Sequence, residues 1–255
     1  MSEVSSAPGR VVAVNVGRPR EVAAGRRRVT TAIWKEPVTG RVRASGVNLE
    51  GDEQADRKVH GGVDKAVYAY ALEDYDWWSA ELGATLELGT VGENLTLAGV
   101  DVTNAVVGER WAIGSAVFEV CQPRTPCHKL GLRMGDAGFP RRFAAAGRPG
   151  AYVRIYSEGD VGADDEVRVV HRPAHGLTVV DVSRARSNDP ILLRRLLAAP
   201  ELADGWLTWA IERALKEFRR NPLDHDLRAV LRTRLLELGL ESGDVDAALD
   251  GPAEG

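Results

Sequence analysis

Short runs of β-branched and alternating residues, separated by glycines and prolines, fill the first two-thirds of the chain. This close spacing leaves room for few helices between strands, so it favours a closed or nearly closed barrel over a sheet of βαβ units. Within this part, only EDYDWWSAEL (73–82) and PRRFAAAG (140–147) have a helical pattern. The fold class is therefore expected to be mainly β. The expected strands are VVAVNV (11–16), VTTAIW (29–34), AVFEV (116–120), AYVRIY (151–156) and EVRVV (166–170).

The C-terminal third has a helical character and follows the predicted linker HRPAHG (171–176). Asp189 and Pro190 can supply the cap and the first-turn proline of a helix through ILLRRLLAA. Two further helices are expected in GWLTWAIERALKEF and LDHDLRAVLRTRLLELGL, and Ser242 could cap a short last one. The predicted domains are a β-barrel over 1–172 and a small helical domain over 177–255.

The charge balance limits the partners that the chain can have. Its 255 residues include 33 Lys and Arg and 37 Asp and Glu, for a formal net charge of −4. This balance does not favour a nucleic-acid backbone or an anionic membrane as a partner. No apolar run approaches the roughly 20 residues that span a bilayer, and the polar start lacks the apolar core of a secretion signal. We therefore expect a cytoplasmic protein whose two cysteines are thiols.

The densest group of polar side chains lies in GVNLEGDEQADRKVHGGVDKAVYAY, residues 46–70. Gly61 and Gly62 permit positive φ and let backbone amides approach an anion closely. A hairpin turn is the simpler explanation of the two glycines alone, and a structural hydrogen bond is the simpler role for His60. The number of polar groups in one loop nevertheless favours a binding site. These groups are Asp52, Gln54, Asp56, Arg57, His60, Asp64 and Lys65.

Both cysteines lie in CQPRTPCHKL, residues 121–130. Cys121 ends an apolar run and is expected to be a buried strand residue. Cys127 lies between two prolines and several cationic groups, and a thiolate so placed suits a soft metal or sulfur transfer. A zinc site of both cysteines with His128 and His60 is the weaker alternative, because CxxC and HExxH pairs are absent. The groups able to stabilise a negative sulfur are Arg124, His128 and Lys129.

The stretch VGENLT (91–96) is a weaker signal. Gly92 permits an unusual backbone conformation and Asn94 offers a donor and an acceptor, although a loop asparagine more often satisfies its own backbone. The patterns GxGxxG, GxxxxGK[ST] and GxSxG are absent, so dinucleotide-binding, P-loop and esterase functions have no support.

Together these stretches resemble the MOSC domain, named for the C-terminal domain of molybdenum cofactor sulfurases, and in particular its YiiM-like bacterial branch. That branch also carries three C-terminal helices, which the pattern after residue 177 resembles. The resemblance therefore implies a MOSC β-barrel with a small C-terminal α-helical domain. The residues that carry it are TAIWKEPVTG (31–40), LEGDEQADRKVHGGVDKAVYAY (49–70), GENLT (92–96), QPRTPCHKL (122–130) and AYVRIYSEGDV (151–161).

The resemblance implies a bound molybdenum cofactor (Mo-molybdopterin), which is a pterin with a dithiolene and a terminal phosphate. It assigns Cys127 as the protein ligand of the metal, and Cys127 and His60 are the catalytic candidates. The pterin and its phosphate need cations, amides and close backbone. The cofactor-binding candidates are Asp52, Gln54, Arg57, His60, Gly61, Gly62, Asp64, Lys65, Asn94, Arg124 and Lys129.

The YiiM-like branch implies reduction of N-hydroxylated compounds such as hydroxylaminopurines or amidoximes. The chain has no flavin, nicotinamide or iron–sulfur signature, so the electrons would come from a partner reductase. Two alternatives stay open, namely a sulfur carrier with a persulfide on Cys127 and a cofactor carrier without turnover. The leucine-rich faces of the last helices are expected in the core or in a homodimer surface rather than on a nucleic acid.

Overall fold

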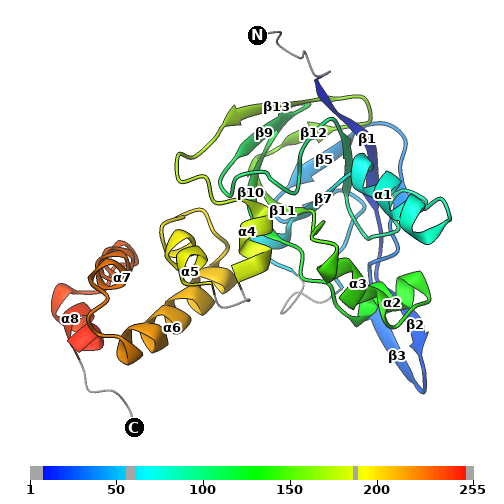
Figure 1. The fold of residues 1–255 in the computed structure, drawn as a ribbon. Coiled ribbons are helices and arrows are strands. Elements are labelled where there is room, and N and C mark those ends of the chain that lie inside the picture. Colours follow the sequence, from blue (N-terminus) through cyan, green and yellow to red (C-terminus); the bar gives the residue numbers. More distant parts are fainter. Residues whose placement is uncertain (1–7, 56–60, 186–188, 251–255) are drawn as a thin grey trace, which may run out of the picture.

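The computed structural model describes residues 8–55, 61–185 and 189–250 and shows a β-barrel next to a group of helices (Figure 1). Seven strands close the barrel in the order β13-β9-β10-β11-β7-β8-β1, and β1 pairs back with β13. Neighbouring strands are antiparallel, except that β7 and β8 are parallel. The mainly β fold class is therefore confirmed. The strands are β1 (Gly9–Val16), β7 (Val67–Ala71), β8 (Leu95–Ala98), β9 (Arg110–Ile113), β10 (Ala116–Pro123), β11 (Ala151–Ser157) and β13 (Glu166–His171).

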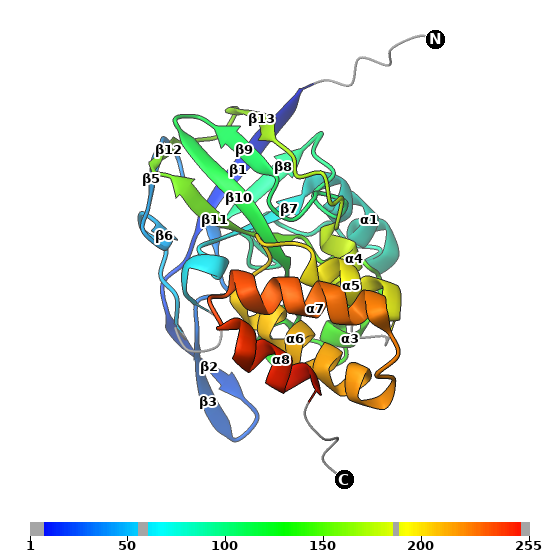
Figure 2. The ribbon, with the colours of Figure 1, turned by 90° about the vertical axis from the view of Figure 1, so that its left-hand side faces the viewer.

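Shorter strands extend the barrel at its edges. β4 (Glu36–Pro37) pairs with β1, and β5 (Val42–Ser45) lies between β6 (Asn48–Leu49) and β12 (Gly159–Val161). β2 (Arg20–Ala24) and β3 (Arg27–Thr31) pair with each other as a hairpin that projects from the barrel (Figures 1 and 2).

The strand expected over 29–34 ends early, at Thr31. The reason is local, because the backbone N–H of Ile33 donates to the Thr31 hydroxyl (3.2 Å) instead of to a neighbouring strand. The residues that follow Thr31 therefore belong to neither strand of the hairpin, and the next strand, β4, begins at Glu36.

The expected helices are present, and the structure adds two short α-helices and one 3-10 turn. Asp189 caps α5 by accepting from the N–H groups of Ile191 and Leu192, as predicted, whereas Ser242 is the first residue of α8 rather than its cap. The two unpredicted helices, α2 and α4, are only seven and six residues long. The helices are η1 (Val63–Lys65, a 3-10 turn), α1 (Leu72–Leu82), α2 (His128–Met134), α3 (Phe139–Ala145), α4 (Val179–Arg184), α5 (Pro190–Leu197), α6 (Asp204–Arg220), α7 (His225–Glu237) and α8 (Ser242–Asp250).

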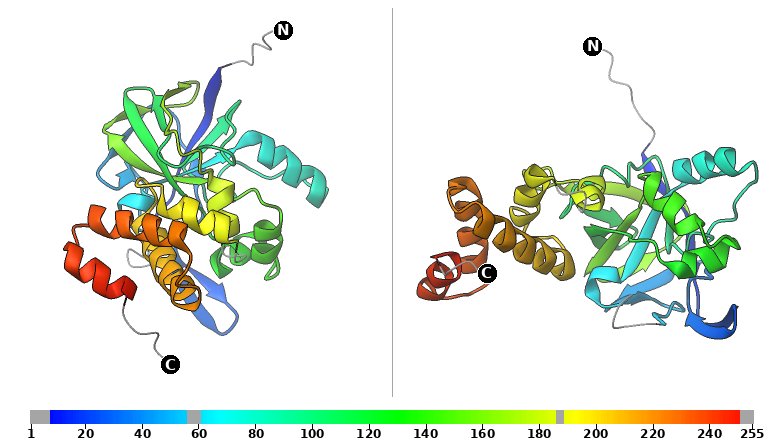
Figure 3. Two further views of the ribbon diagram at one scale, coloured as in Figure 1. Left: turned by 60° about the vertical axis from the view of Figure 1, so that its left-hand side comes forward. Right: turned by 60° about the horizontal axis from the view of Figure 1, so that its bottom comes forward.

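The C-terminal helices gather at one end of the barrel, with α4 close to β10 and with α7 and α8 farther out (Figures 1 and 3). Their apolar faces form one hydrophobic cluster that also includes Val107 and Cys121 of the barrel. On α7, Leu227, Leu231 and Leu235 are buried in this cluster. That face is therefore core, and a homodimer stays a prediction. No helix in the described part of the chain is long and apolar enough to cross a membrane.

Candidate functional site

A cavity opens beside the end of β10, at the point where the chain runs into α2. It brings together side chains that are far apart in the sequence, and several of them are predicted site residues. The predictions for Arg57 and His60 fall outside the described residues. The predicted residues that line the cavity are Asp52, Gln54, Lys65, Asn94, Arg124, Cys127 and Lys129. Its other lining residues include Thr31, Ile33, Lys35, Glu53, Tyr68, Gly92 and Tyr152.

Cys127 occupies the N-cap of α2, with extended backbone angles (φ −127°, ψ 175°). The backbone N–H of Leu130 donates to the Cys127 carbonyl (3.0 Å), and the Leu130 side chain is fully buried. The helix is thus anchored by its apolar residue, and this holds the half-buried thiol at the cavity wall. His128 is exposed and does not line the cavity, so of the three predicted neighbours only Arg124 and Lys129 share the cavity with Cys127.

Cys121 is a fully buried residue of β10, as expected. Its Sγ lies 3.1 Å from the Asp64 carbonyl oxygen and 3.3 Å from the Tyr152 carbonyl oxygen, so its single S–H can donate to either, and burial raises the pKa of the thiol. It therefore stays protonated and does not compete with Cys127 for a metal. Among the described residues, no group of three His, Cys, Asp or Glu side chains could hold a metal ion, which leaves the zinc alternative without support there.

Arg124 places a positive charge in the buried wall of the cavity. Its side chain is 7% exposed, donates to the Val91 carbonyl and lies 5.0 Å from the ring centroid of Tyr68. Burial disfavours this charge, but the influence of Tyr68, Tyr152 and Cys127 outweighs burial and raises the Arg124 pKa. The guanidinium is thus permanently charged close to the thiol.

Lys35 is a cavity residue that the sequence analysis missed. Its ammonium forms an ion pair with the buried Asp52, although burial lowers the Lys35 pKa against the opposing effect of that carboxylate. Asp52 also accepts from the Gly17 N–H (2.8 Å) and from Asn94 Nδ2 (3.0 Å). Asn94 Oδ1 in turn accepts from the Tyr68 N–H (3.1 Å). Asp52 and Asn94 therefore hold the cavity wall together through several bonds each.

The glycine loop is tied down by a side chain. Gln54 Oε1 accepts from the Gly62 N–H (3.0 Å), and its Nε2 donates to the carbonyls of Val47 (3.0 Å) and Lys65 (3.1 Å). Gly62 has φ 92°, the positive value that the two glycines were expected to allow. Its amide is occupied by Gln54, however, and neither Gly61 nor Gly62 lines the cavity. The Gly62 amide is therefore already bonded within the loop, and anion binding by this loop stays a prediction.

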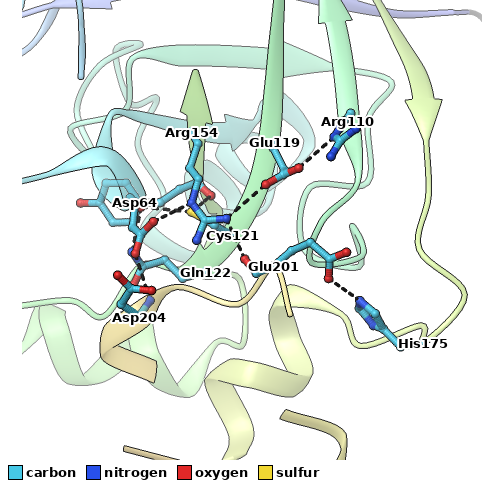
Figure 4. Close-up of polar contacts among 10 residues, drawn as sticks. Asp64, Arg110, Glu119, Cys121, Gln122, Arg154, His175, Glu201 and Asp204 are labelled. Carbon is cyan, nitrogen blue, oxygen red and sulfur yellow. Dashed lines mark hydrogen bonds and ion pairs between the residues drawn. The ribbon is translucent and has the colours of Figure 1, made fainter. Parts of the chain in front are cut away.

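Asp64 does not line the cavity and takes part in contacts between the barrel and the helices (Figure 4). Its carboxylate pairs with Arg154 Nε (2.6 Å) and accepts from the Asp204 N–H at the start of α6 (3.0 Å). Arg154 also pairs with Glu119 (3.1 Å), which accepts from Arg110 (2.8 Å). These five residues form what we call the barrel–helix joint. The cofactor-binding prediction for Asp64 has no geometric support, because Asp64 belongs to this joint.

Glu93 is a second residue that the sequence analysis missed. It does not line the cavity itself, but both of its neighbours in the chain do. It is fully buried and accepts from the Tyr75 hydroxyl (2.8 Å), the Gly89 N–H (2.7 Å) and the Thr96 hydroxyl (2.8 Å). Burial raises the pKa of this carboxyl despite those bonds. The neighbouring Gly92 lines the cavity at φ 83°, where an added Cβ would lie 2.7 Å from the Ile33 side chain. The stretch GEN thus combines a required glycine with a buried acid.

The side chains around the cavity suit a soft metal with an anionic organic ligand. Cys127 offers sulfur, which soft metals prefer. The lining includes four cationic side chains and two carboxylates, an excess of positive charge that favours a phosphate or another anion. The enclosed space is about 100 Å³, below the ~300–1,000 Å³ of small-molecule pockets, so the described residues can enclose only part of such a ligand. The cationic lining residues are Lys35, Lys65, Arg124 and Lys129.

Comparisons with known proteins agree on a family. The MOSC domain family matches residues 56–168. The uncharacterized protein YflK of Bacillus subtilis is 33% identical over 199 residues, which cover 77% of this chain and 90% of YflK. The crystal structure of YiiM from Geobacillus stearothermophilus has a TM-score of 0.67 at 26% identity and covers 81% of this chain and 99% of that one.

A longer relative is named a reductase. This protein of Gibberella moniliformis is 33% identical over 181 residues, which are 69% of this chain but only 32% of the relative. The chain therefore spans about a third of that reductase, and the rest of its length lies outside the similarity.

Proposed function

This chain belongs to the MOSC domain family, in its YiiM-like part, and from that premise we propose that it binds a molybdenum cofactor and reduces N-hydroxylated compounds. MOSC domains are associated in general with molybdenum cofactor binding. The observation that carries the proposal is a half-buried thiol, Cys127, in a cavity lined by an excess of cationic side chains.

In this proposal Cys127 holds the metal, and the cationic side chains hold the anionic part of the cofactor. Arg124 is fixed by the Val91 carbonyl and by the aromatic rings around it, so its charge is placed before any ligand arrives. Lys65 and Lys129 also line the cavity. Lys35 is already paired with Asp52, so it contributes less to an added anion.

The reaction consumes two electrons and two protons for each N-hydroxyl group, R–NH–OH, and yields R–NH2 and water. The bound metal would supply the two-electron chemistry at the substrate oxygen. The chain's own part is to bind and orient the substrate and to keep polar groups in a defined protonation state. Tyr152 lines the cavity, and its hydroxyl is a hydrogen-bond donor at neutral pH; burial raises its pKa further above its ordinary value of 10.0.

The electrons would come from a separate protein. The sequence carries no flavin, nicotinamide or iron–sulfur signature, and this supports a separate electron donor.

Molybdenum content and turnover, measured together, test the proposal. Wild type, Cys127→Ser and Cys121→Ser would be made in a host that produces the cofactor and assayed for metal by elemental analysis. Reduction of a hydroxylaminopurine would be driven by reduced methyl viologen. We expect wild type and Cys121→Ser to contain molybdenum and to turn over, because the hydroxyl of a serine at 121 can donate to one of the two carbonyls that lie near the thiol. Cys127→Ser is expected to lose both.

The same preparations separate the alternatives. A wild type that is full of molybdenum but cannot reduce the hydroxylamine contradicts the reductase proposal and favours a cofactor carrier. A persulfide on Cys127 in mass spectra, without bound molybdenum, favours sulfur transfer.

A further inference from the structure

The β2–β3 hairpin stands apart from the barrel (Figures 1 and 3). Its strands pair only with each other, and β3 ends at Thr31, which lines the cavity together with Ala32 and Ile33. At the ~3.3 Å rise of a strand residue, the turn of the hairpin lies roughly 15 Å beyond Thr31. A protein that docks on this hairpin would therefore also lie over the rim of the cavity.

The hairpin and its approach carry a charge opposite to that of the whole chain. Five arginines and one glutamate lie between residues 18 and 28, in a chain with a formal net charge of −4. All five arginines are exposed. We call this set the arginine hairpin: Arg18, Arg20, Arg26, Arg27 and Arg28.

Acidic side chains of the chain itself neutralise only part of the arginine hairpin. Arg28 pairs with Glu21 (2.8 Å), and Arg18 lies 4.0 Å from Glu53. Within the part of the chain that the structure describes, Arg26 and Arg27 form no ion pair. Exposed charges are often only a solvated surface, but here charge of one sign is concentrated on a projecting element at the rim of the cavity.

One contact fixes the base of the hairpin. The Arg20 guanidinium lies 4.4 Å from the ring centroid of Trp34, a half-buried residue just after the cavity-lining segment. An isolated two-stranded hairpin is marginally stable in water, so this contact and the short connection to the barrel help to keep it in place. The charged surface is thus held next to the cavity.

We propose that the arginine hairpin is the docking surface for an acidic electron-carrier protein, which supplies the electrons that the proposed reduction consumes. This inference rests on the proposed function, because the carrier is needed only if the cavity performs a reduction. Two one-electron carriers are oxidised for each N-hydroxyl group reduced, and the two protons come from water. Redox encounters use small interfaces, and complementary charge speeds them in a salt-dependent way.

Binding of two acidic electron carriers, a flavodoxin and a plant-type ferredoxin, tests the docking surface without turnover. The full chain would be compared with Arg26→Glu/Arg27→Glu and with a matched charge reversal, Arg219→Glu/Arg220→Glu, at the exposed end of α6. We expect the hairpin variant to raise the Kd of at least one carrier about tenfold, the control to leave it within about twofold, and added salt to weaken wild-type binding.

The docking proposal is wrong if neither carrier binds the wild-type chain or if the hairpin variant binds as tightly as wild type. It is also wrong if the control variant loses as much affinity as the hairpin variant. Binding of single-stranded DNA or anionic vesicles through the hairpin, without carrier binding, would also overturn it and indicate a general polyanion site. Methyl viologen needs no docking, so the hairpin variant should keep wild-type turnover with it. Carrier binding through the hairpin together with no viologen-driven turnover would leave the docking surface standing and refute the proposed function.

Discussion

The cavity and the barrel–helix joint meet at η1, where neighbouring residues serve different clusters. Lys65 lines the cavity, whereas Asp64 pairs with Arg154 in the joint (Figure 4). In the joint, the carboxylates of Asp64 and Glu119 are paired with Arg154 and Arg110, so these four charges balance. In the cavity, cationic side chains outnumber carboxylates and a thiol is present. Balanced ion pairs thus stabilise the contact between barrel and helices, whereas an excess of positive charge in the cavity suits an anionic ligand.

The Lys35–Asp52 pair is the exception, because it is a balanced pair inside the cavity wall. Removing one partner of a buried pair leaves an uncompensated charge, so Asp52→Asn is expected to lower the free energy of unfolding by ~3–5 kcal/mol. Urea unfolding followed by circular dichroism measures this change. The double variant Lys35→Met/Asp52→Asn should recover part of the loss. A single variant within ~0.5 kcal/mol of wild type would show that the pair does not support the wall.

The joint can be broken without touching the cavity. Arg154→Met leaves Asp64 without its arginine and weakens Glu119, and because these groups are partly exposed we expect a loss of ~2 kcal/mol in the free energy of unfolding. Molybdenum content per folded chain should stay at the wild-type level. Arg28→Met, which removes an exposed pair, is the control and should cost less than ~1 kcal/mol. Loss of molybdenum in Arg154→Met would mean that the joint also shapes the cavity.

The pH dependence of stability tests whether Glu93 keeps its proton in the folded chain. Of the three predicted effects on stability, this one is expected to be the smallest. The ordinary pKa of this carboxyl is 4.5, and burial raises the pKa in the folded chain. Between those two values the folded chain binds more protons than the unfolded chain, so this group makes stability fall as pH rises through that window. Glu93→Gln should remove this part of the fall.

At a pH below the window both side chains are neutral, so the two proteins should be equally stable there. Urea midpoints measured from pH 4 to pH 8 compare the slopes. Asp74, whose pKa is also raised by burial, titrates in both proteins and cancels in the comparison. Parallel profiles over the whole range would contradict a buried, proton-retaining Glu93.

Local patterns were sufficient for much of the fold. β-branched runs predicted β1, β10, β11 and β13, and Asp189-Pro190 predicted the start of α5, because strand alternation and helix capping are set by nearby residues. The short helices α2 and α4 escaped prediction, since such segments are fixed by tertiary contacts such as the burial of Leu130.

The site was predicted less completely than the fold. The resemblance to a family pointed to Cys127 and to cationic residues that share its cavity, although their roles stay predictions. The sequence could not predict that Lys65 lines the cavity and Asp64 does not. The backbone turn of η1 decides which of these two neighbours faces the cavity. Lys35 and Glu93 were missed because a charged residue is expected at the surface until a buried partner or hydrogen bonds are visible.

Closure of the barrel by its first and last strands has a consequence for how the protein is made. β1 pairs with β13, Gly9 opposite Val167, so the barrel cannot close until residue 167 has left the ribosome. At ~5–20 residues per second, β1 waits on the order of ten seconds or more with an unpaired edge. The C-terminal helices contact one another mainly within a short span of sequence and can form quickly once the barrel offers its apolar surface. Substitutions that slow strand pairing are therefore expected to reduce the yield of folded protein during synthesis more than its final stability.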